Sequence, residues 1–235
     1  MLVTVVDPAS GSISQLGQAR STVTGSTTAE RAANAVREEV VEGRLRPGTR
    51  LPDTELAEAL GVSRNTMREA MSQLVTERVL ERHPNRGVYV ATPGVADVQD
   101  VYRARRLIER AAVRWGQDLD PTRIAALRAA VDEGQNAAAL GDWPGVASAN
   151  QHFHRALVGL AGSPRLEQQM ALLLAEMRLI FHRMPGVREF HEPFVGRNDG
   201  ICRLLEAGDR EGAEQALADY FDEAESQLLE SYAQL

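Results

Sequence analysis

A short stretch between residues 63 and 68 carries side chains suited to contacting a nucleic-acid duplex. Arg64 and Arg68 stand four residues apart, so on a helix both project from one flank near its start. Ser63, Asn65 and Thr66 complete the polar set. Guanidinium, carboxamide and hydroxyl groups on an exposed N-terminal turn can hydrogen-bond to phosphates and to base edges. The chemistry that this stretch predicts is therefore contact with double-stranded DNA.

The same stretch has the periodicity of an amphipathic helix. Met67, Ala70, Met71 and Leu74 fall at i, i+3, i+4 and i+7, which places them on one apolar face. Ser63 is a favourable N-cap for this helix. The alternative is a solvated helix whose arginines only maintain solubility, because charged helix faces are common. The neighbouring elements decide between the two.

The segment upstream favours DNA recognition. A short helix opening near Asp53 has Leu56, Ala57 and Leu60 on its buried side, and Gly61 suits the left-handed turn that ends it. Two helices joined by so few residues have the spacing of a helix-turn-helix.

The segment downstream looks like a two-stranded wing over residues 79–83 and 87–91. Pro84, Asn85 and Arg86 favour a turn between the strands, and Gly87 permits an unusual backbone angle. Arg86 in this turn would add a second basic point of contact beside the arginines of the helix.

Residues 30–91 resemble the winged helix-turn-helix of the GntR family of bacterial transcription regulators. The matching segments are residues 45–51, 55–57, 61–64, 68–70 and 86–87. The resemblance implies DNA contacts by Ser63, Arg64, Asn65, Thr66, Arg68, Arg50, Arg86 and Gly87, with the helix in the major groove and the wing at the adjacent backbone or minor groove. Thr54 stands where many family members carry a DNA-contacting arginine, so we expect one contact of the family to be missing.

Length and charge are compatible with this interpretation. A chain of 235 residues can form two modest domains. The net charge is −7, but residues 1–92 are neutral and the whole acidic excess lies in residues 93–235. The single cysteine, Cys202, excludes a disulfide framework or a thiolate zinc site within one chain. The sequence has neither the pattern of a signal peptide nor an apolar stretch of membrane length, so we expect a cytoplasmic protein without a membrane partner.

The sequence divides into three parts. Residues 1–27 are rich in Ser, Thr, Gly and Gln and lack an apolar period, which predicts a flexible tail. Residues 28–92 form the winged helix-turn-helix domain, and its first helix ends near residue 42. Residues 93–235 contain only helical patterns, over about 95–116, 121–140, 143–161, 164–184, 188–207 and 209–233. The predicted fold is mainly α: an N-terminal winged helix-turn-helix followed by an all-α helical bundle.

The helical part resembles the FCD effector domain found in the FadR branch of the GntR family. The matching residues are Tyr102, Arg105, Glu109, Phe153, His154, Ile201, Ala213 and the segments 162–166 and 205–209. The resemblance implies that residues 93–235 dimerise and bind a small-molecule effector.

Many FCD domains hold a divalent metal with one aspartate and three histidines. The resemblance places those ligands at Asn150, His154, Asn198 and Tyr220. Only His154 retains a family ligand, and carboxamide oxygens are poor ligands for transition metals. His152, His182 and His191 could substitute in principle, although His152 cannot share a helix face with His154. We therefore expect no tightly bound metal and no other cofactor.

The same four positions could line an effector pocket between helices, which is a usual place for a small-molecule site. Arg105 matches an arginine that often faces this pocket in the family, and its guanidinium suits a carboxylate ligand. The alternative is that Arg105 pairs with Glu109, four residues on. Trp115 and Trp143 are predicted to be core residues rather than stacking platforms.

The sequence as a whole predicts a homodimeric, ligand-responsive transcription regulator, and we expect a repressor. Two-fold symmetry would require an inverted-repeat operator, and a small anionic metabolite would control operator binding. The first alternative is a regulator of the same architecture that senses acyl thioesters. The second is a helical-bundle enzyme with an accessory DNA-binding module, although the sequence contains no nucleophile motif, phosphate loop or zinc-hydrolase signature.

Overall fold

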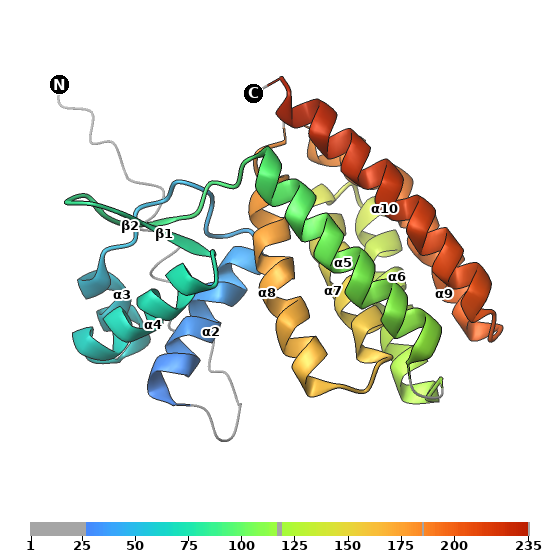
Figure 1. Cartoon of the computed structure of the whole chain (residues 1–235), viewed down its shortest axis with the longest axis horizontal. Coiled ribbons are helices and arrows are strands. Elements are labelled where there is room, and N and C mark those ends of the chain that lie inside the picture. The colour runs from blue at the N-terminus through green and yellow to red at the C-terminus, as the bar shows by residue number, and fades with distance from the viewer. Residues whose placement is uncertain (1–26, 117–118, 185, 235) are drawn as a thin grey trace. The chain divides into compact units, whose positions relative to one another are not determined.

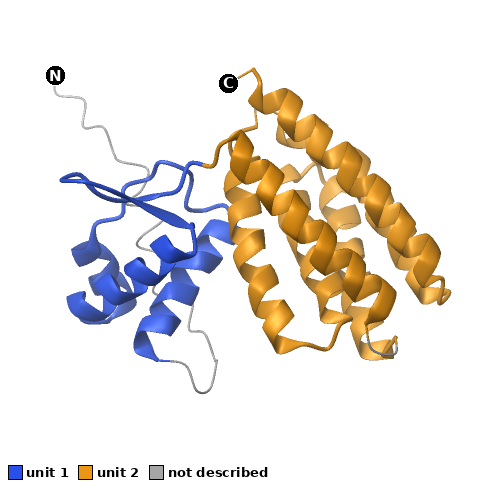
Figure 2. Ribbon diagram, viewed as in Figure 1, with its two compact units in different colours: residues 1–92 blue, residues 93–235 orange. Residues whose placement is uncertain are grey.

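The computed structural model describes residues 27–116, 119–184 and 186–234. The chain forms two compact units, residues 1–92 and residues 93–235 (Figure 2). The tail predicted at residues 1–27 lies outside the described residues except for Thr27, which is the N-cap of the first described helix.

Over its described residues, the first unit contains three helices and a two-stranded wing (Figure 1). In chain order these are α2 (Thr28–Val41), α3 (Asp53–Leu60), α4 (Arg64–Thr76), β1 (Leu80–His83) and β2 (Gly87–Val90). A capping box starts α2, because the Thr27 hydroxyl accepts from the Glu30 amide and the Glu30 carboxylate accepts from the Thr27 amide. Val36 and Val40 of α2 are fully buried, and this helix packs against α4.

The wing is an antiparallel pair of short strands. The turn places Asn85 at φ 60° and Gly87 at φ 106°, in the left-handed region that Asn and Gly tolerate best. Val88 and Val90, alternate residues of β2, are buried, whereas the turn is exposed. The alternation of apolar residues along β2 therefore buries one face of the wing, and the exposed turn remains accessible to a partner.

The second unit is built from helices alone over its described residues. These are α5 (Val95–Trp115), α6 (Pro121–Ala139), α7 (Trp143–Gly159), α8 (Pro164–Phe181), α9 (Val187–Glu206) and α10 (Arg210–Tyr232). Proline lies in the first turn of α6, α7 and α8, and an Asp or Ser side chain caps each of them. The helices begin where the sequence supplies these caps, so the predicted fold class is confirmed.

Aromatic and aliphatic side chains from these helices form the core of the second unit. Phe153, Phe194 and Phe221 are almost completely buried, and the rings of Phe194 and Tyr220 lie 4.5 Å apart. Helix α5 packs against α10, and α9 packs against α6, α7 and α10 (Figure 1). Segments far apart in the sequence are thereby brought side by side around one apolar centre.

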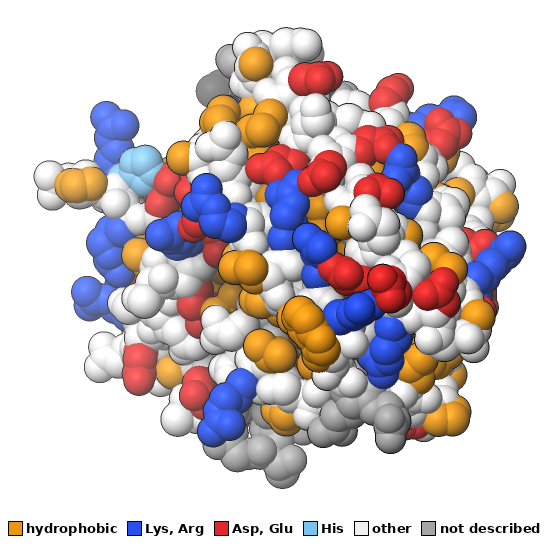
Figure 3. Space-filling view, turned by 45° about the vertical axis from the view of Figure 1, so that its right-hand side comes forward, with side chains coloured by type: hydrophobic (Ala, Val, Ile, Leu, Met, Phe, Trp, Pro, Cys, Tyr) orange, Lys and Arg blue, Asp and Glu red, His pale blue; other side chains and the backbone are white. Residues whose placement is uncertain are grey.

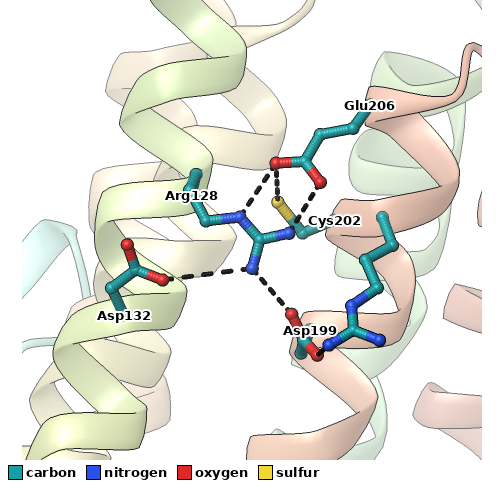
Figure 4. Close-up of polar contacts among 6 residues, drawn as sticks. Arg128, Asp132, Asp199, Cys202 and Glu206 are labelled. Carbon is teal, nitrogen blue, oxygen red and sulfur yellow. Dashed lines mark hydrogen bonds and ion pairs between the residues drawn. The ribbon is translucent and has the colours of Figure 1, made fainter.

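Ion pairs reinforce the packing of α6 against α9. The Arg128 guanidinium donates to Asp199 at 2.6 Å and to both carboxylate oxygens of Glu206 at 2.8 and 2.7 Å (Figure 4). Burial raises the pKa of the neighbouring Cys202 thiol to about 11, so this thiol is protonated at neutral pH. Acidic and basic side chains alternate over the face of the molecule seen in Figure 3, which agrees with such pairing across the surface.

The prediction that both tryptophans are core residues is wrong. Trp115 is 79% exposed, because it is two residues after the buried Val113 and so faces away from the core side of α5. Trp143 is half-buried at the start of α7, where the guanidinium of Arg188 lies 5.0 Å from its ring centre.

Over the described residues, every helix is too short or too polar to cross a bilayer.

Candidate nucleic-acid interface and effector site

Local sequence chemistry fixes the turn between α3 and α4. Gly61 ends α3 in the left-handed conformation, with φ 66° and ψ 31°. Ser63 then caps α4, because its hydroxyl accepts from the Thr66 amide at 3.1 Å. Val62 is the one residue between the C-cap Gly61 and the N-cap Ser63, so this short turn fixes the direction of α4 relative to α3.

Helix α4 separates an apolar face from a polar face, as predicted. Met67, Ala70, Met71 and Leu74 are buried. The opposite face is open to solvent, and the side chains of Arg64 and Arg68 are 65% and 68% exposed. Asn65 is exposed and Thr66 is half-buried. Packing therefore fixes the helix while the polar turn remains available to a partner.

Asp53 is a member of this surface that the sequence analysis did not select. Its Oδ1 lies 3.4 Å from Nη2 of Arg64, and its Oδ2 lies 3.9 Å from Nε of Arg68. The hydroxyl of Thr54 also donates to Asp53 Oδ1, at 3.3 Å. The partners are 11 and 15 residues apart in the chain, so no helical spacing in the sequence indicates the contact.

The wing carries the remaining predicted DNA contacts. Arg50 pairs through its backbone with Tyr89 of β2, and its side chain is exposed. Arg86 and Gly87 are exposed at the end of the wing, and the Arg86 carbonyl accepts from the Tyr89 hydroxyl at 3.3 Å. A β-carbon placed on Gly87 would lie 3.7 Å from Nε of Arg50, which shows that Arg50 reaches the wing turn.

In the second unit, one buried hydrogen-bonded chain joins all the predicted effector residues. Arg105 of α5 donates to Glu109 Oε1 at 2.7 Å, and Glu109 Oε2 lies 2.6 Å from Nδ1 of His154 on α7. Nε2 of His154 lies 3.2 Å from the hydroxyl of Tyr220 on α10. Arg105 and Glu109 form the internal pair that was the alternative to a pocket-facing arginine. Glu109 is a central member that the sequence analysis considered only as a partner of Arg105.

The chain continues from Tyr220 to two carboxamides. The Tyr220 hydroxyl donates to Asn150 Oδ1 at 3.1 Å, and Asn198 Nδ2 donates to the same oxygen at 2.8 Å. The chain, which we call the polar chain, consists of Arg105, Glu109, His154, Tyr220, Asn150 and Asn198. It links four helices, α5, α7, α9 and α10.

Burial and the charges within the polar chain together set its protonation. Burial alone would raise the pKa of Glu109, but Arg105 and His154 hold it below its ordinary value. Burial, aided by the positive charge of Arg105, lowers the pKa of His154 in spite of Glu109. Burial raises the pKa of Tyr220. At neutral pH the chain therefore contains one guanidinium, one carboxylate, a neutral imidazole and a neutral phenol, with no net charge.

These residues do not fit the aspartate-and-three-histidine metal site of many FCD domains. Nδ1 of His154 faces the Glu109 carboxylate at 2.6 Å, and Nε2 lies 3.2 Å from the Tyr220 hydroxyl oxygen. The phenol of Tyr220 stays protonated, and Asn150 and Asn198 offer carboxamides in place of charged or imidazole ligands. The described part of the chain contains no group of three or more His, Cys, Asp or Glu side chains that could hold an ion.

A cavity of about 10 Å³ adjoins the carboxamide end of the polar chain, lined by Asn150, Asn198, His191 and apolar side chains. This volume is at the lower limit for holding a single water. Among the described residues, the buried atoms that have no hydrogen-bond partner include Asn198 Oδ1, His191 Nδ1 and Arg105 Nη2. Polar groups with unused hydrogen-bonding capacity are thus present, and the cavity as it stands is too small for a metabolite.

A winged helix-turn-helix followed by an all-helical domain defines a DNA-binding transcription regulator. Residues 28–90 match the bacterial regulatory proteins of the gntR family, and residues 100–223 match the FCD domain. The chain therefore belongs to the GntR family, with an FCD effector domain. Winged helices of this family bind DNA and FCD domains bind small-molecule effectors, so the protein is a ligand-responsive regulator and not an enzyme.

Known proteins resemble the chain over most of its length. A solved GntR-type regulator from Rhodococcus sp. RHA1 shares 39% identity, with a TM-score of 0.78, and the match covers 87% of this chain and 98% of that one. The transcriptional regulator McbR of Escherichia coli is 26% identical over 208 residues, 85% of this chain and 91% of McbR. A probable D-xylose utilization operon repressor of Paenarthrobacter nicotinovorans is 27% identical over 201 residues, 83% of this chain and 86% of that protein.

Proposed function

We propose that the protein is a homodimeric repressor that binds an inverted-repeat operator and is released by a small organic acid. The observation that carries the DNA-binding part is the polar turn of α4, which exposes Arg64, Asn65 and Arg68 above a fully packed apolar face. The repressor role is supported by the relative from Paenarthrobacter nicotinovorans, which is described as a probable repressor. One winged helix covers one half-site, so a two-fold dimer reads two half-sites related by symmetry.

Arg64, Asn65 and Arg68 enter the major groove in this proposal, with Ser63 and Thr66 at the start of the helix. Arg50, Arg86 and Gly87 contact the backbone or minor groove beside it. Thr54 brings no positive charge to the surface, and its hydroxyl is directed to Asp53. Thr54 therefore does not supply the positive charge that an arginine at this position provides in the family.

The effector proposal rests on the polar chain. Arg105 uses Nε for Glu109, whereas its buried Nη2 has no hydrogen-bond partner among the described residues. A guanidinium has five N–H donors, so a ligand carboxylate can bind Nη2 without displacing Glu109. Asn150, His154, Asn198 and Tyr220 would hydrogen-bond to the remainder of the ligand. An acyl thioester sensor of the same architecture is not favoured, because this chain of polar groups is suited to a small polar anion.

Replacing Arg68 with alanine tests the DNA-binding proposal. A bidentate contact from arginine is worth about 1–3 kcal/mol per half-site, and a dimer loses it twice. Operator affinity should therefore fall by at least about 30-fold. The probe is a duplex enriched by the wild-type protein from a random-sequence library, titrated by fluorescence anisotropy at fixed salt.

Arg31→Ala is the matched control, because Arg31 is an exposed arginine on α2 outside the predicted contact set. Sedimentation velocity of each variant establishes whether the dimer is intact. Wild-type operator affinity in Arg68→Ala, or an equal loss in Arg31→Ala, would rule out the assignment of α4 as the recognition helix.

A further inference from the structure

An acidic side chain lies between the two arginines that are proposed to read DNA. Each carboxylate oxygen of Asp53 faces a different arginine: Oδ1 faces Arg64 at 3.4 Å, and Oδ2 faces Arg68 at 3.9 Å. Asp53 is the first residue of α3, whereas both arginines belong to α4. A negative charge in the centre of a surface that meets polyanionic DNA requires a physical explanation.

Stabilisation of the helix dipole does not by itself explain this arrangement. An acid in the first turn of α3 does favour the helix, but Glu55 also occupies that turn. The Asp53 side chain is 31% exposed and is directed across the turn to α4, where it contacts both arginines. Asp53 therefore lies within ion-pair distance of both arginines of α4 at once.

The geometry has different consequences for base contacts and for phosphate contacts. Arg64 uses Nη2 and Arg68 uses Nε towards Asp53, so each retains further N–H donors for a base edge. An arginine that moves to a phosphate gives up the ion pair, and the phosphate approaches an uncompensated carboxylate. Non-specific binding depends almost entirely on phosphate contacts, whereas specific binding adds the base edges.

We propose that Asp53 is a positioning residue that determines specificity: it orients Arg64 and Arg68 towards base edges and weakens their binding to phosphates. This inference rests on the proposed DNA-contacting role of the two arginines. It assigns the selectivity of the surface in part to a residue that need not touch DNA. Removing its charge should raise affinity for any DNA while reducing the discrimination in favour of the operator.

The test compares Asp53→Asn with wild type on two duplexes, the library-enriched operator and a scrambled duplex of the same length and composition. Asparagine keeps the size of the side chain and removes the charge. An exposed ion pair is worth up to about fivefold in an equilibrium constant, and a dimer contains two such sites. The ratio of operator affinity to scrambled-duplex affinity should fall about tenfold, with tighter binding to the scrambled duplex.

Salt dependence provides a second readout that a loss of helix stability would not produce. The logarithmic salt slope for the scrambled duplex should become steeper by about one unit per additional phosphate contact. Glu58→Gln is the matched control, because Glu58 is an exposed carboxylate on the same helix and its replacement removes the same charge. Far-UV circular dichroism confirms that each variant is folded.

Failure of the proposed role of Asp53 can be distinguished from failure of the proposed DNA-binding surface. An affinity ratio in Asp53→Asn within twofold of wild type, or an equal change in Glu58→Gln, overturns the role of Asp53 while leaving the recognition helix in place. If Arg68→Ala still binds the operator normally, the proposed DNA surface itself is wrong.

Discussion

The buried ion pair between Arg105 and Glu109 gives the most sharply defined prediction for the second unit. Their side chains are 2% and 0% exposed, and the pair is joined by a hydrogen bond of 2.7 Å. Replacing Arg105 with alanine leaves a buried carboxylate with His154 as its only remaining partner in the polar chain. Removing one member of a buried pair typically costs about 3–5 kcal/mol, since the other charge stays uncompensated. We expect a loss of this size in the free energy of unfolding of the second unit.

Tryptophan fluorescence can follow this unit within the whole chain. The protein has two tryptophans, Trp115 and Trp143, and both lie in the second unit. In a urea titration, the expected loss corresponds to a shift of the midpoint by roughly 2 M, at a slope of about 2 kcal/mol/M. Circular dichroism at the same urea concentrations reports on the whole chain, so the two units can be distinguished.

Two further variants separate the buried pair from a general effect of arginine. Arg103→Ala removes an arginine that is 74% exposed, two residues away on the same helix, and should cost less than about 1 kcal/mol. Arg105→Met combined with Glu109→Gln removes both charges and should be less destabilising than Arg105→Ala alone. A midpoint for Arg105→Ala close to that of Arg103→Ala would refute the argument that Glu109 depends on this arginine.

Three other predictions follow from the same region. Burial lowers the pKa of His191 to about 3, so the free energy of unfolding is highest above about pH 6.5 and falls as the pH drops towards 3. His191→Phe should recover about 1.4 kcal/mol of the stability that is lost between pH 7.5 and pH 5.5. Urea unfolding at each pH measures this difference. Purified protein should contain less than one tightly held divalent ion per chain after dialysis, and stoichiometric zinc that disappears in His154→Ala would contradict the description of the polar chain. Arg105→Lys keeps a charge beside Glu109 but lacks the planar fork, so it should bind operator normally and lose the response to organic acids; release of DNA at the wild-type acid concentration would exclude Arg105 from the effector site.

The boundaries of the helices were predictable because they depend on local chemistry. Gly61 and Ser63 end one helix and begin the next through their own backbone and side-chain preferences, and Asp209 caps α10 in the same way. The burial of Met67 and Leu74 follows from the helical period. Exposure of a large apolar residue was less predictable, since Trp115 is apolar but lies off the buried face of its helix.

The arrangement of the candidate sites was predictable only in part. The spacing of four residues indicates the pair between Arg105 and Glu109, but no spacing indicates that His154, 45 residues on, binds the other oxygen of Glu109. The contact of Asp53 with Arg64 likewise depends on how two helices cross. Contacts within one helix can be read from sequence periods, whereas contacts between helices depend on packing.

The closed state of the polar chain explains why ligand binding there would change the protein. A ligand shifts a conformational equilibrium only by the difference between its affinities for the two states. The cavity beside Asn150 and Asn198 has a volume of about 10 Å³, so in this state a metabolite is excluded by simple size. Any arrangement that admits one must break the bond between Asn198 and Asn150 or part the helices that carry them. Ligand affinity would then differ between the closed and open states, and under the proposed function that difference would supply the free energy for a change in operator binding. A site with the same ligand affinity in both states would bind the ligand without producing a response.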